Sequence, residues 1–313
     1  MLSKIVRMTK NLFTDPLIRF HYFNKLGLLR LMSDEKFLQK EFPIRMGYPL
    51  DLKSPKTFNE KIQWLKIHDR NPIHTEWVDK YEVRKYIADW CGEEHLIPLL
   101  GGPWDRFDDI DFDSLPDRFV LKCTHNSGGI AICTDKSKFD IAAAREKINA
   151  GLKENFFWAH REWPYKDVKP RIIAEAYMED ENATAGLTDY KFFCYGKIPK
   201  LVHVSDGMSD HSQCGISYFD LEGNRLPFQR SNYPAVREDF RMPDNLAEMT
   251  ALAARIAERV DRSFVRVDLY SICGKIYFSE ITLFPSAGLL HFEPKEWDRT
   301  LGDWMELEDN SSD

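Results

Sequence analysis

Cysteine is scarce in this sequence of 313 residues, and none of its six cysteines belongs to a CxxC pair. Because His and Cys do not cluster at ligand spacing, the pattern excludes a zinc site, and it is not that of a disulfide-rich secreted domain. It predicts reduced, buried thiols and a cytoplasmic protein. A disulfide between Cys123 and Cys133, which would face each other across a hairpin, is the minor alternative.

Long apolar runs are also lacking. No stretch approaches the roughly 20 apolar residues that span a bilayer, and the first residues lack the apolar run of a signal peptide, so we expect a soluble protein. Residues 1–23 mix basic with apolar side chains, which suits a helix lying peripherally on the anionic inner membrane surface. The alternative for this segment is a helix packed on its own domain.

An excess of positive charge is absent too. The 43 basic residues against 50 acidic ones give a net charge of -7, which disfavours duplex nucleic acid as a partner. The hydrophobic fraction of 43% is that of a globular protein, and the length allows two or three packed subdomains. Only the tail, residues 306–313, is expected to be flexible.

Two kinds of periodicity follow one another along the chain. Residues 1 to about 100 read as mainly helical, with a capping box at Thr57-Phe-Asn-Glu60 and a further helix from about Trp77 to Gly92. A period of two then marks strands, so the fold class is predicted to be α+β. The expected strands are 119–124, 130–133, 170–178, 189–195 and 199–204, and the expected later helices are 140–157 and one that Pro243-Asp244 caps.

A hairpin near the C-terminus carries acidic residues in its middle. Phe264, Arg266, Asp268 and Tyr270 share one face, and Val265, Val267 and Leu269 share the other, which is the core face. A turn near Cys273 would set Asp268 opposite Phe278 and diagonal to Glu280, roughly 7 to 8 Å away, which leaves room for a cation between two carboxylates. The alternative is an ordinary strand with an Arg266–Asp268 ion pair on a solvated face.

Lys122 lies in a predicted strand just before Ser127-Gly128-Gly129. A lysine beside a glycine connection can form a phosphate cradle, although a surface lysine before a simple turn has the same pattern. With Lys191 and the Asp268/Glu280 pair, the chain has cations for phosphates and carboxylates for magnesium. The patterns GxxxxGK[ST] and GxGxxG are both absent, which disfavours those nucleotide-binding folds.

Seven short motifs occur in a characteristic order. They are Lys56-Thr-Phe-Asn-Glu-Lys-Ile-Gln-Trp-Leu65, Asp79-Lys-Tyr-Glu-Val-Arg84, Phe119-Val-Leu-Lys122 with His125-Asn-Ser-Gly128, Ile173-Ala-Glu175, Asp189-Tyr-Lys-Phe192, Phe264-Val-Arg-Val-Asp-Leu-Tyr270 and Gly274-Lys-Ile-Tyr-Phe-Ser-Glu280. Their order resembles that of the motifs in the ATP-grasp superfamily. Their amino-acid sequences resemble those of its TupA-like branch, over residues 45–302. The resemblance implies two α+β lobes around a nucleotide cleft.

That resemblance also implies a division of the chain and a role for each matched residue. Residues 1–75 would be the mainly helical N-terminal region, 76–183 the first lobe with the glycine loop, and 184–305 the second lobe with the metal-binding hairpin. Lys191 and Arg266 would be catalytic, and Asp268, Glu280 and Thr282 would bind Mg²⁺. ATP would be bound by Arg84, Lys122, Ser127, Gly128, Gly129, Glu175, Ala176, Tyr177, Met178 and Asp189.

The activity that the resemblance implies is an ATP- and Mg²⁺-dependent ligase that activates a carboxylate as an acylphosphate for attack by an amine. The branch further suggests cell-surface polysaccharide biosynthesis, with an amino acid or other amine joined to a uronic acid of a glycan or its precursor. Many members carry Asn where Thr282 stands, and this departure leaves a second metal ion open. Further candidates for substrate contact, each with a structural role as its alternative, are His125, Asn126, His203, Arg225 and His291.

Three other functions fit parts of the sequence. The same ATP site would serve a kinase that phosphorylates a sugar hydroxyl. The DxD spacing of Asp109-Ile-Asp111 and Asp111-Phe-Asp113 would suit a sugar-nucleotide glycosyltransferase, although such an acidic run also solvates a loop. A non-catalytic ATP-binding module is the third alternative, because of Thr282.

Overall fold

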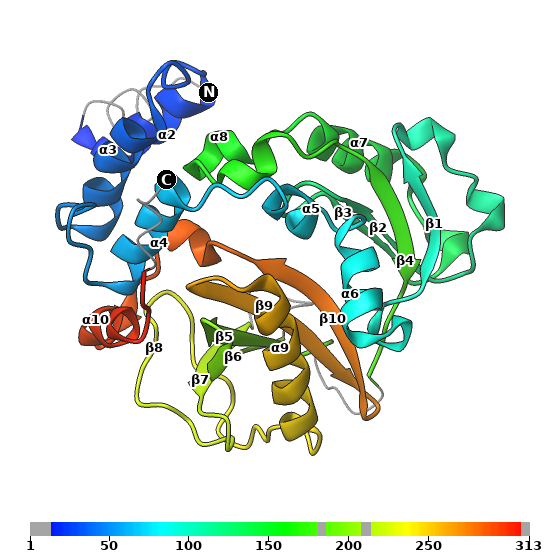
Figure 1. Cartoon of the computed structure of the whole chain (residues 1–313). Coiled ribbons are helices and arrows are strands. Elements are labelled where there is room, and N and C mark those ends of the chain that lie inside the picture. Colours follow the sequence, from blue (N-terminus) through cyan, green and yellow to red (C-terminus); the bar gives the residue numbers. More distant parts are fainter. Residues whose placement is uncertain (1–13, 181–185, 208–213, 308–313) are drawn as a thin grey trace.

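The computed structural model describes residues 14–180, 186–207 and 214–307 of the chain. Two larger antiparallel sheets, a two-stranded sheet of β8 (Gln229–Arg230) and β11 (Phe292–Glu293), and the helices around them form an α+β architecture, as predicted (Figure 1). The helices are α2 Pro16–Lys25, α3 Asp34–Met46, α4 Phe58–His68, α5 His74–Val78, α6 Val83–Cys91, α7 Ile141–Leu152, α8 Phe157–His160, α9 Leu246–Val260 and α10 Glu296–Asp303. The strands are β1 Leu99–Trp104, β2 Phe119–Cys123, β3 Ile130–Cys133, β4 Ile172–Ala176, β5 Asp189–Tyr195, β6 Ile198–Asp206, β7 Gly215–Phe219, β8 Gln229–Arg230, β9 Phe264–Ile272, β10 Lys275–Thr282 and β11 Phe292–Glu293.

The first sheet has four strands in the order β1-β4-β2-β3 and lies at the right in Figure 1, with α7 against it. Its core forms because alternate residues of β2, such as Phe119 and Leu121, point toward α7 and meet Ile148. Asp140 begins α7 by accepting a hydrogen bond from the N–H of Ala143, so the predicted start of this helix is confirmed. The helix ends at Leu152, earlier than predicted, and α8 is a separate short helix.

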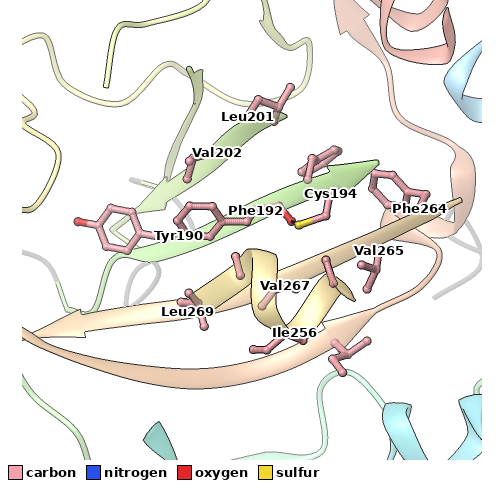
Figure 2. Packing of buried hydrophobic residues seen from close by; sticks show 14 of the residues in the cluster. Tyr190, Phe192, Cys194, Leu201, Val202, Ile256, Phe264, Val265, Val267 and Leu269 are labelled. Atoms are coloured by element: carbon pink, nitrogen blue, oxygen red, sulfur yellow. Dashed lines mark hydrogen bonds between the residues drawn. The ribbon is translucent and has the colours of Figure 1, made fainter. Parts of the chain in front are cut away.

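The second sheet has five strands in the order β10-β9-β5-β6-β7, and α9 covers one face of it. The apolar sides of β5 and β9 pack beneath this helix, as Figure 2 shows for Phe192, Val267 and Ile256. This confirms that Val265, Val267 and Leu269 form the core face of the acidic hairpin. The opposite face of the same two strands is therefore left for Lys191, Arg266 and Asp268.

The hairpin has a different register from the predicted one. Cys273 and Gly274 both have positive φ at its turn, and β10 contains a bulge between Phe278 and Glu280. As a result Phe278 pairs with Leu269, and Glu280 lies directly opposite Asp268 rather than diagonal to it. The prediction that Asp268 faces Phe278 was wrong for two reasons. The turn is centred between Cys273 and Gly274, which already pairs Phe278 with Leu269, and the bulge after Phe278 then sets Glu280 instead of Ser279 opposite Asp268.

The N-terminal helices pack beside the two sheets as predicted for a mainly helical region (Figure 1). The capping box of α4 is present, with Thr57 and Glu60 each accepting a hydrogen bond from the backbone N–H of the other. The helix expected from Trp77 to Gly92 is divided into α5 and α6. The division lies at Asp79, whose carboxylate accepts hydrogen bonds from Tyr81 N–H and the Arg171 guanidinium.

All six cysteines are free thiols, and five of them are buried as predicted. Cys273 is exposed because it lies in the tight turn of the hairpin. Cys123 and Cys133 are not joined: Cys133 pairs across the sheet with Phe119. Within the three described ranges, no helix has the length and apolar content needed to cross a membrane.

Some predictions fall partly outside the described residues. They are the first 13 residues of the basic and apolar segment, most of the flexible tail, and residues 181–185 of the loop expected between the lobes. The start of α9 is described and differs slightly from the prediction: its N-cap is Asn245 rather than Pro243-Asp244, and the side chain of Asn245 makes no capping hydrogen bond.

Candidate functional site

A cavity of about 320 Å³ lies between the two sheets. An isolated bridge between Leu96 and Phe278 and a hydrogen bond between His95 Nδ1 and the carbonyl oxygen of Ile276 connect the two sides next to it. We call this cavity the cleft; charged side chains dominate its wall, and Leu96, Ile130 and Phe278 add an apolar part. The charged residues are the cations Lys80, Arg84, Lys122, Lys191 and Arg266 and the acids Glu175, Asp189, Asp268 and Glu280.

Arg266 lies at the centre of the acidic hairpin. Its guanidinium donates to both oxygens of Asp268, at 2.7 and 2.5 Å, and to Glu280 Oε1 at 3.2 Å. It also donates to the hydroxyl of Thr282, which in turn donates to Glu280 Oε1. Both carboxylates therefore have Arg266 as a positive partner. Asp268 is bound in the two-pronged geometry that only arginine provides, and Glu280 is bound by one hydrogen bond.

The two acids of the hairpin differ in environment. Asp268 is almost completely buried, and this burial raises its pKa against the opposing effect of Arg266 and Lys191. The side chain of Glu280 is 39% exposed. Burial also opposes its ionisation, but Lys80, Arg266 and Lys191 together lower the pKa of Glu280, so it is a carboxylate at neutral pH.

Lys191 continues this charge network onto β5. Its ammonium lies 2.9 Å from Asp189 Oδ2 and 3.6 Å from Asp268 Oδ2, because β5 pairs with β9 so that Lys191 and Asp268 are cross-strand partners. Although burial opposes its charge, the two carboxylates raise the pKa of Lys191. A positively charged lysine therefore stands beside the acidic pair.

Glu175 organises the cations on the opposite side of the cleft. Its two oxygens accept hydrogen bonds from Arg84 at 3.1 Å and from Lys122 at 2.6 Å. Arg84 also donates to the carbonyl oxygen of Ile97, which ties α6 to the strand region before β1. Glu175 is 6% exposed, so its side chain positions Arg84 and Lys122 in the wall of the cleft.

The glycine loop between β2 and β3 is held at both ends. Lys80, a residue for which no role was predicted, donates from its ammonium to the carbonyl oxygen of Asn126. A Cβ on Gly129 would lie 2.6 Å from the Cys123 sulfur, so only glycine fits there, and Gly128 has a φ of +126°. Ser127 and Gly128 are exposed at the tip of the loop.

A second loop, η6 (Pro285–Gly288), follows the acidic hairpin directly. Ser286 and Ala287 both have positive φ, a conformation that costs energy for residues other than glycine. Helix α4 holds this loop: Gln63 donates to the carbonyl oxygens of Ala287 and Gly288, and the buried Lys66 also donates to that of Ala287. The motif that begins at Lys56 is therefore a support for the loop beside the acids.

Most of the predicted site residues meet in the cleft. Arg84, Lys122, Glu175, Asp189, Lys191, Arg266, Asp268 and Glu280 line it. The other predicted site residues do not: they are Ser127, Gly128, Gly129, Ala176, Tyr177, Met178 and Thr282. The sequence reasoning missed Lys80, Tyr270 and Ser279, which also line the cleft. All three residues belong to the motifs named above, and this membership could have identified them as site residues.

The structure places the additional candidates for substrate contact in different environments. His125 and Asn126 are buried and bind the carbonyl oxygen of Gly151, so both have structural roles. Arg225 is exposed and donates to the carbonyl oxygens of Val236 and Arg237. His203 lines a second cavity, described below, and His291 lines neither cavity.

The acids with DxD spacing lie on two surface 3-10 turns and not in the cleft. Asp109 pairs with Arg106, and Asp111 accepts a hydrogen bond from the backbone N–H of Asp113. These local contacts match the alternative interpretation, in which the acidic run solvates a surface loop.

The donors in the cleft suit magnesium only together with a nucleotide. Within the described part of the chain, no group of three or more His, Cys, Asp or Glu side chains is arranged to hold a metal ion. Mg²⁺ is commonly held by one or two carboxylates while phosphate oxygens and water complete its six ligands. Asp268 and Glu280, facing each other in register, match that requirement, with Thr282 bonded to both Glu280 and Arg266.

Comparison with solved structures finds similarities at low sequence identity. Structures similar to the chain include D-alanine–D-alanine ligase from Helicobacter pylori (13% identity, 79% of this chain and 69% of that chain, TM-score 0.42). They also include the same ligase from Bacillus anthracis complexed with ATP (15%, 74% and 65%, 0.40) and N5-carboxyaminoimidazole synthetase from Staphylococcus aureus (12%, 66% and 44%, 0.36). The chain thus spans less than half of the Staphylococcus protein. No curated protein matches the sequence significantly.

Two antiparallel sheets around a cleft of cations and paired carboxylates are the architecture of ATP-grasp proteins, a class of ATP-dependent ligases. The model of one family, TupA-like ATPgrasp, matches residues 60–306. The chain belongs to the TupA-like ATP-grasp family, which confirms the resemblance seen in the motifs and the predicted enzyme class.

Proposed function

We propose that this protein is an ATP- and Mg²⁺-dependent ligase that joins the carboxylate of one substrate to an amine through an acylphosphate. The observation that carries the proposal is the composition of the cleft, in which five cations and four carboxylates from both sheets and the α6 region face one space. Phosphoryl transfer needs both kinds of charge, because cations stabilise the phosphate oxygens and carboxylates hold the metal ion.

We assign the residues that line the cleft different roles according to their positions. Lys122 and Lys80 would contact the phosphates from the side of the glycine loop, while Leu96, Ile130 and Phe278 offer apolar surfaces for the adenine ring. Asp268 and Glu280 would hold Mg²⁺, which would supply charge neutralisation at the phosphates. Lys191 and Arg266 would stabilise the transferred phosphoryl group and the acceptor carboxylate.

For the biological substrate, we propose a uronic-acid-containing glycan or its precursor as the acid and an amino acid or other amine as the nucleophile. This places the enzyme in biosynthesis of capsule, O-antigen or a teichuronopeptide-like polymer. The support is membership of the TupA-like ATP-grasp family, together with the motifs that the chain shares with that branch.

The test is a screen of uronic acids against amino acids with Mg²⁺ and ATP, in which ADP, free phosphate and the coupled product are all measured. A ligase releases ADP and free phosphate together with an amide. Formation of ADP and a phosphorylated sugar without free phosphate would instead support the kinase alternative. Binding of a UDP-sugar in place of ATP would support the glycosyltransferase, and absence of any Mg²⁺-dependent ATP turnover would support the non-catalytic module.

We also propose that the cytoplasmic protein associates with an anionic membrane surface through α2 and the turns that follow it. One side of α2 packs on the domain through Phe20 and through Asn24, which donates to the carbonyl oxygen of Trp158. Among the residues that the structure describes, seven of the eleven exposed large hydrophobic side chains lie in this short segment: Leu17, Ile18, Tyr22, Phe23, Leu26, Leu28 and Leu31.

The charge of this segment complements anionic lipid. Arg19, Lys25 and Arg30 stand among the exposed apolar residues, whereas the acidic residue Asp15 is engaged in capping α2. Apolar side chains beside basic ones favour the interface of an anionic bilayer.

The membrane proposal predicts sedimentation with phosphatidylglycerol-containing vesicles but not with pure phosphatidylcholine vesicles. Replacing Leu28 and Leu31, which are 64% and 101% exposed, by glutamate should abolish binding. The matched control is Ile132→Glu, a substitution of a 58% exposed apolar residue on β3. Equal sedimentation of the double variant and the wild-type protein would contradict the proposal.

A further inference from the structure

A second cavity, of about 170 Å³, adjoins the cleft. Lys191 and Arg266 line both spaces, so these two cations form a shared wall. The other lining residues come from β5, β6, β7, β8, the residues after β8 and the loop after the acidic hairpin. They are Phe193, His203, Ser205, Cys214, Ile216, Arg230, Tyr233, Pro285, Ser286 and Leu290.

The two cavities differ in whether acidic residues line them. The cleft has four acidic residues in its wall, whereas the lining of the second cavity contains three cations and no carboxylate. Two of these cations, Lys191 and Arg266, already have acidic partners across the shared wall. Arg230 provides the additional positive charge, so the second cavity is suited to an anion and not to a metal ion.

Arg230 has no acidic partner among the described residues. Its guanidinium lies over the ring of Tyr233, 4.9 Å from the ring centroid. The backbone of Arg230 is fixed because it pairs with Phe292 of β11, and because Phe228, two residues earlier, stacks between Tyr218 and Trp297. A partly buried arginine that is fixed but lacks a carboxylate retains its hydrogen-bonding capacity for a ligand.

His203 adds an uncharged hydrogen-bonding group to a cavity whose cations suit an anion, so the lining can also bind neutral polar groups of the same ligand. Burial, with Lys191, Arg266 and Arg230 nearby, holds the pKa of His203 well below its usual value, so the ring is neutral at physiological pH. Its Nε2 atom lies 3.2 Å from the hydroxyl of Ser205. Neutral imidazole and hydroxyl groups of this kind match the hydroxyls of a sugar or hydroxy acid.

The remaining wall limits the size of the ligand. Phe193, Ile216, Pro285 and Leu290 provide apolar surface, and a volume of about 170 Å³ is below the ~300–1,000 Å³ of typical small-molecule pockets. Such a space fits one sugar-sized unit and not an internal stretch of polymer.

We propose that the second cavity binds the acid substrate as a single sugar-sized unit, and that Arg230 is the specificity-determining residue that binds its anionic group through a two-pronged salt bridge. The proposal rests on the proposed ligase function, because it assigns the acceptor to the space that shares Lys191 and Arg266 with the nucleotide cleft. The carboxylate would enter with its oxygens between Arg230 and the shared wall, next to the position of the transferred phosphoryl group.

The test is calorimetric titration of the full-length chain, first with Mg²⁺ and ADP and then with D-glucuronate as the probe acid. The wild-type protein should bind D-glucuronate and should not bind methyl glucoside, the neutral sugar. Arg230→Met should weaken D-glucuronate binding about 10- to 100-fold, as expected for loss of hydrogen bonds to a charged group. Arg230→Lys should be intermediate, because it keeps the charge but not the fork.

The matched control is Arg225→Met, because Arg225 lies on the same segment, lines neither cavity and should leave D-glucuronate binding unchanged. Wild-type affinity in Arg230→Met, binding of methyl glucoside as tight as that of D-glucuronate, or absence of D-glucuronate binding to a protein that binds Mg²⁺ and ADP would overturn the proposal for this cavity. Failure to bind Mg²⁺ and ADP would instead overturn the proposed function itself, so the two failures are distinct.

Discussion

Arg266 donates hydrogen bonds to three different side chains, and two of them, Asp268 and Glu280, are the acids proposed to hold Mg²⁺. The sequence presented the Arg266–Asp268 pair and a metal site as alternatives. In the structure the same guanidinium bonds Asp268 and Glu280 while lining both cavities. The two carboxylates are therefore held in place by a residue that is itself part of the site.

At the scale of single residues, Glu280→Gln is the cleanest test of metal binding. The side chain is 39% exposed, so the folded protein should lose no more than about 1 kcal/mol, whereas Mg²⁺-dependent ADP release should fall at least about 100-fold. Thermal unfolding and an ADP assay measure the two effects. Glu258→Gln, a change of an exposed residue on α9, should alter neither, and normal turnover in Glu280→Gln would remove Glu280 from the metal site.

Asp268→Asn should behave differently from Glu280→Gln. Asp268 is 1% exposed and accepts two hydrogen bonds from Arg266, so its neutralisation leaves buried cations without their main partner. We expect a loss of about 3 kcal/mol or more in the free energy of unfolding, measured by urea denaturation, in addition to a loss of turnover. A variant as stable as the wild-type protein would show that Glu280 and Asp189 suffice to balance Arg266 and Lys191.

At the scale of elements, α4 and the loop after β10 form one unit although more than 200 residues separate them in the sequence. Asn59 accepts a hydrogen bond from the N–H of Leu290 and donates one to its carbonyl oxygen, while Gln63 and Lys66 bind the strained Ala287. The motif that begins at Lys56 could be found in the sequence, but its purpose could not. The strain at Ser286 and Ala287 appears only in the folded backbone.

Asn59→Ala should therefore destabilise the protein by about 2 to 4 kcal/mol in urea denaturation, because it leaves two buried backbone groups of Leu290 without partners. Asn155→Ala is the matched control: Asn155 also bonds two backbone groups, Lys166 C=O and Phe157 N–H, but it is exposed and should cost less than about 1 kcal/mol. Equal losses in the two variants would contradict the role assigned to burial of this contact.

At the scale of the whole molecule, two buried histidines make stability depend on pH. Burial lowers the pKa of His74 to about 3 and that of His203 well below its usual value. Both side chains take up protons near pH 6.5 when the chain unfolds, so the unfolded state binds more protons below that pH, and stability falls as the pH decreases. Between pH 7 and pH 5 each histidine should contribute a loss of about 2 kcal/mol.

Urea denaturation at pH 7 and pH 5 measures this loss. His74→Gln and His203→Gln should each show a smaller difference between the two pH values than the wild-type protein does. His21→Gln, which changes an exposed histidine on α2, should keep the wild-type difference. Identical differences in all four proteins would rule out the histidines as its source.

Much of the fold could be predicted because each local pattern agreed with its neighbours. Alternation placed Val265, Val267 and Leu269 under α9, and the capping box marked the start of α4. The cleft was found through acids and lysines inside motifs. The register of the hairpin could not be predicted, because the bulge before Glu280 depends on how β10 meets the rest of the sheet.

The second cavity had no sequence signal of this kind. Arg230 stands in a two-residue strand, and its place beside Lys191 depends on pairing with β11 and on the stacked rings around Phe228. Distant segments supply these contacts, so neither periodicity nor spacing could indicate them.

The wall that the two cavities share has a thermodynamic consequence. Because Lys191 and Arg266 face both spaces, a charge bound on one side changes the potential felt on the other. Linkage then requires reciprocity: the factor by which Mg²⁺ and nucleotide alter the affinity for the acid must equal the factor by which the acid alters the affinity for Mg²⁺ and nucleotide. Two cations in one wall thus make the two substrates effectors of one another.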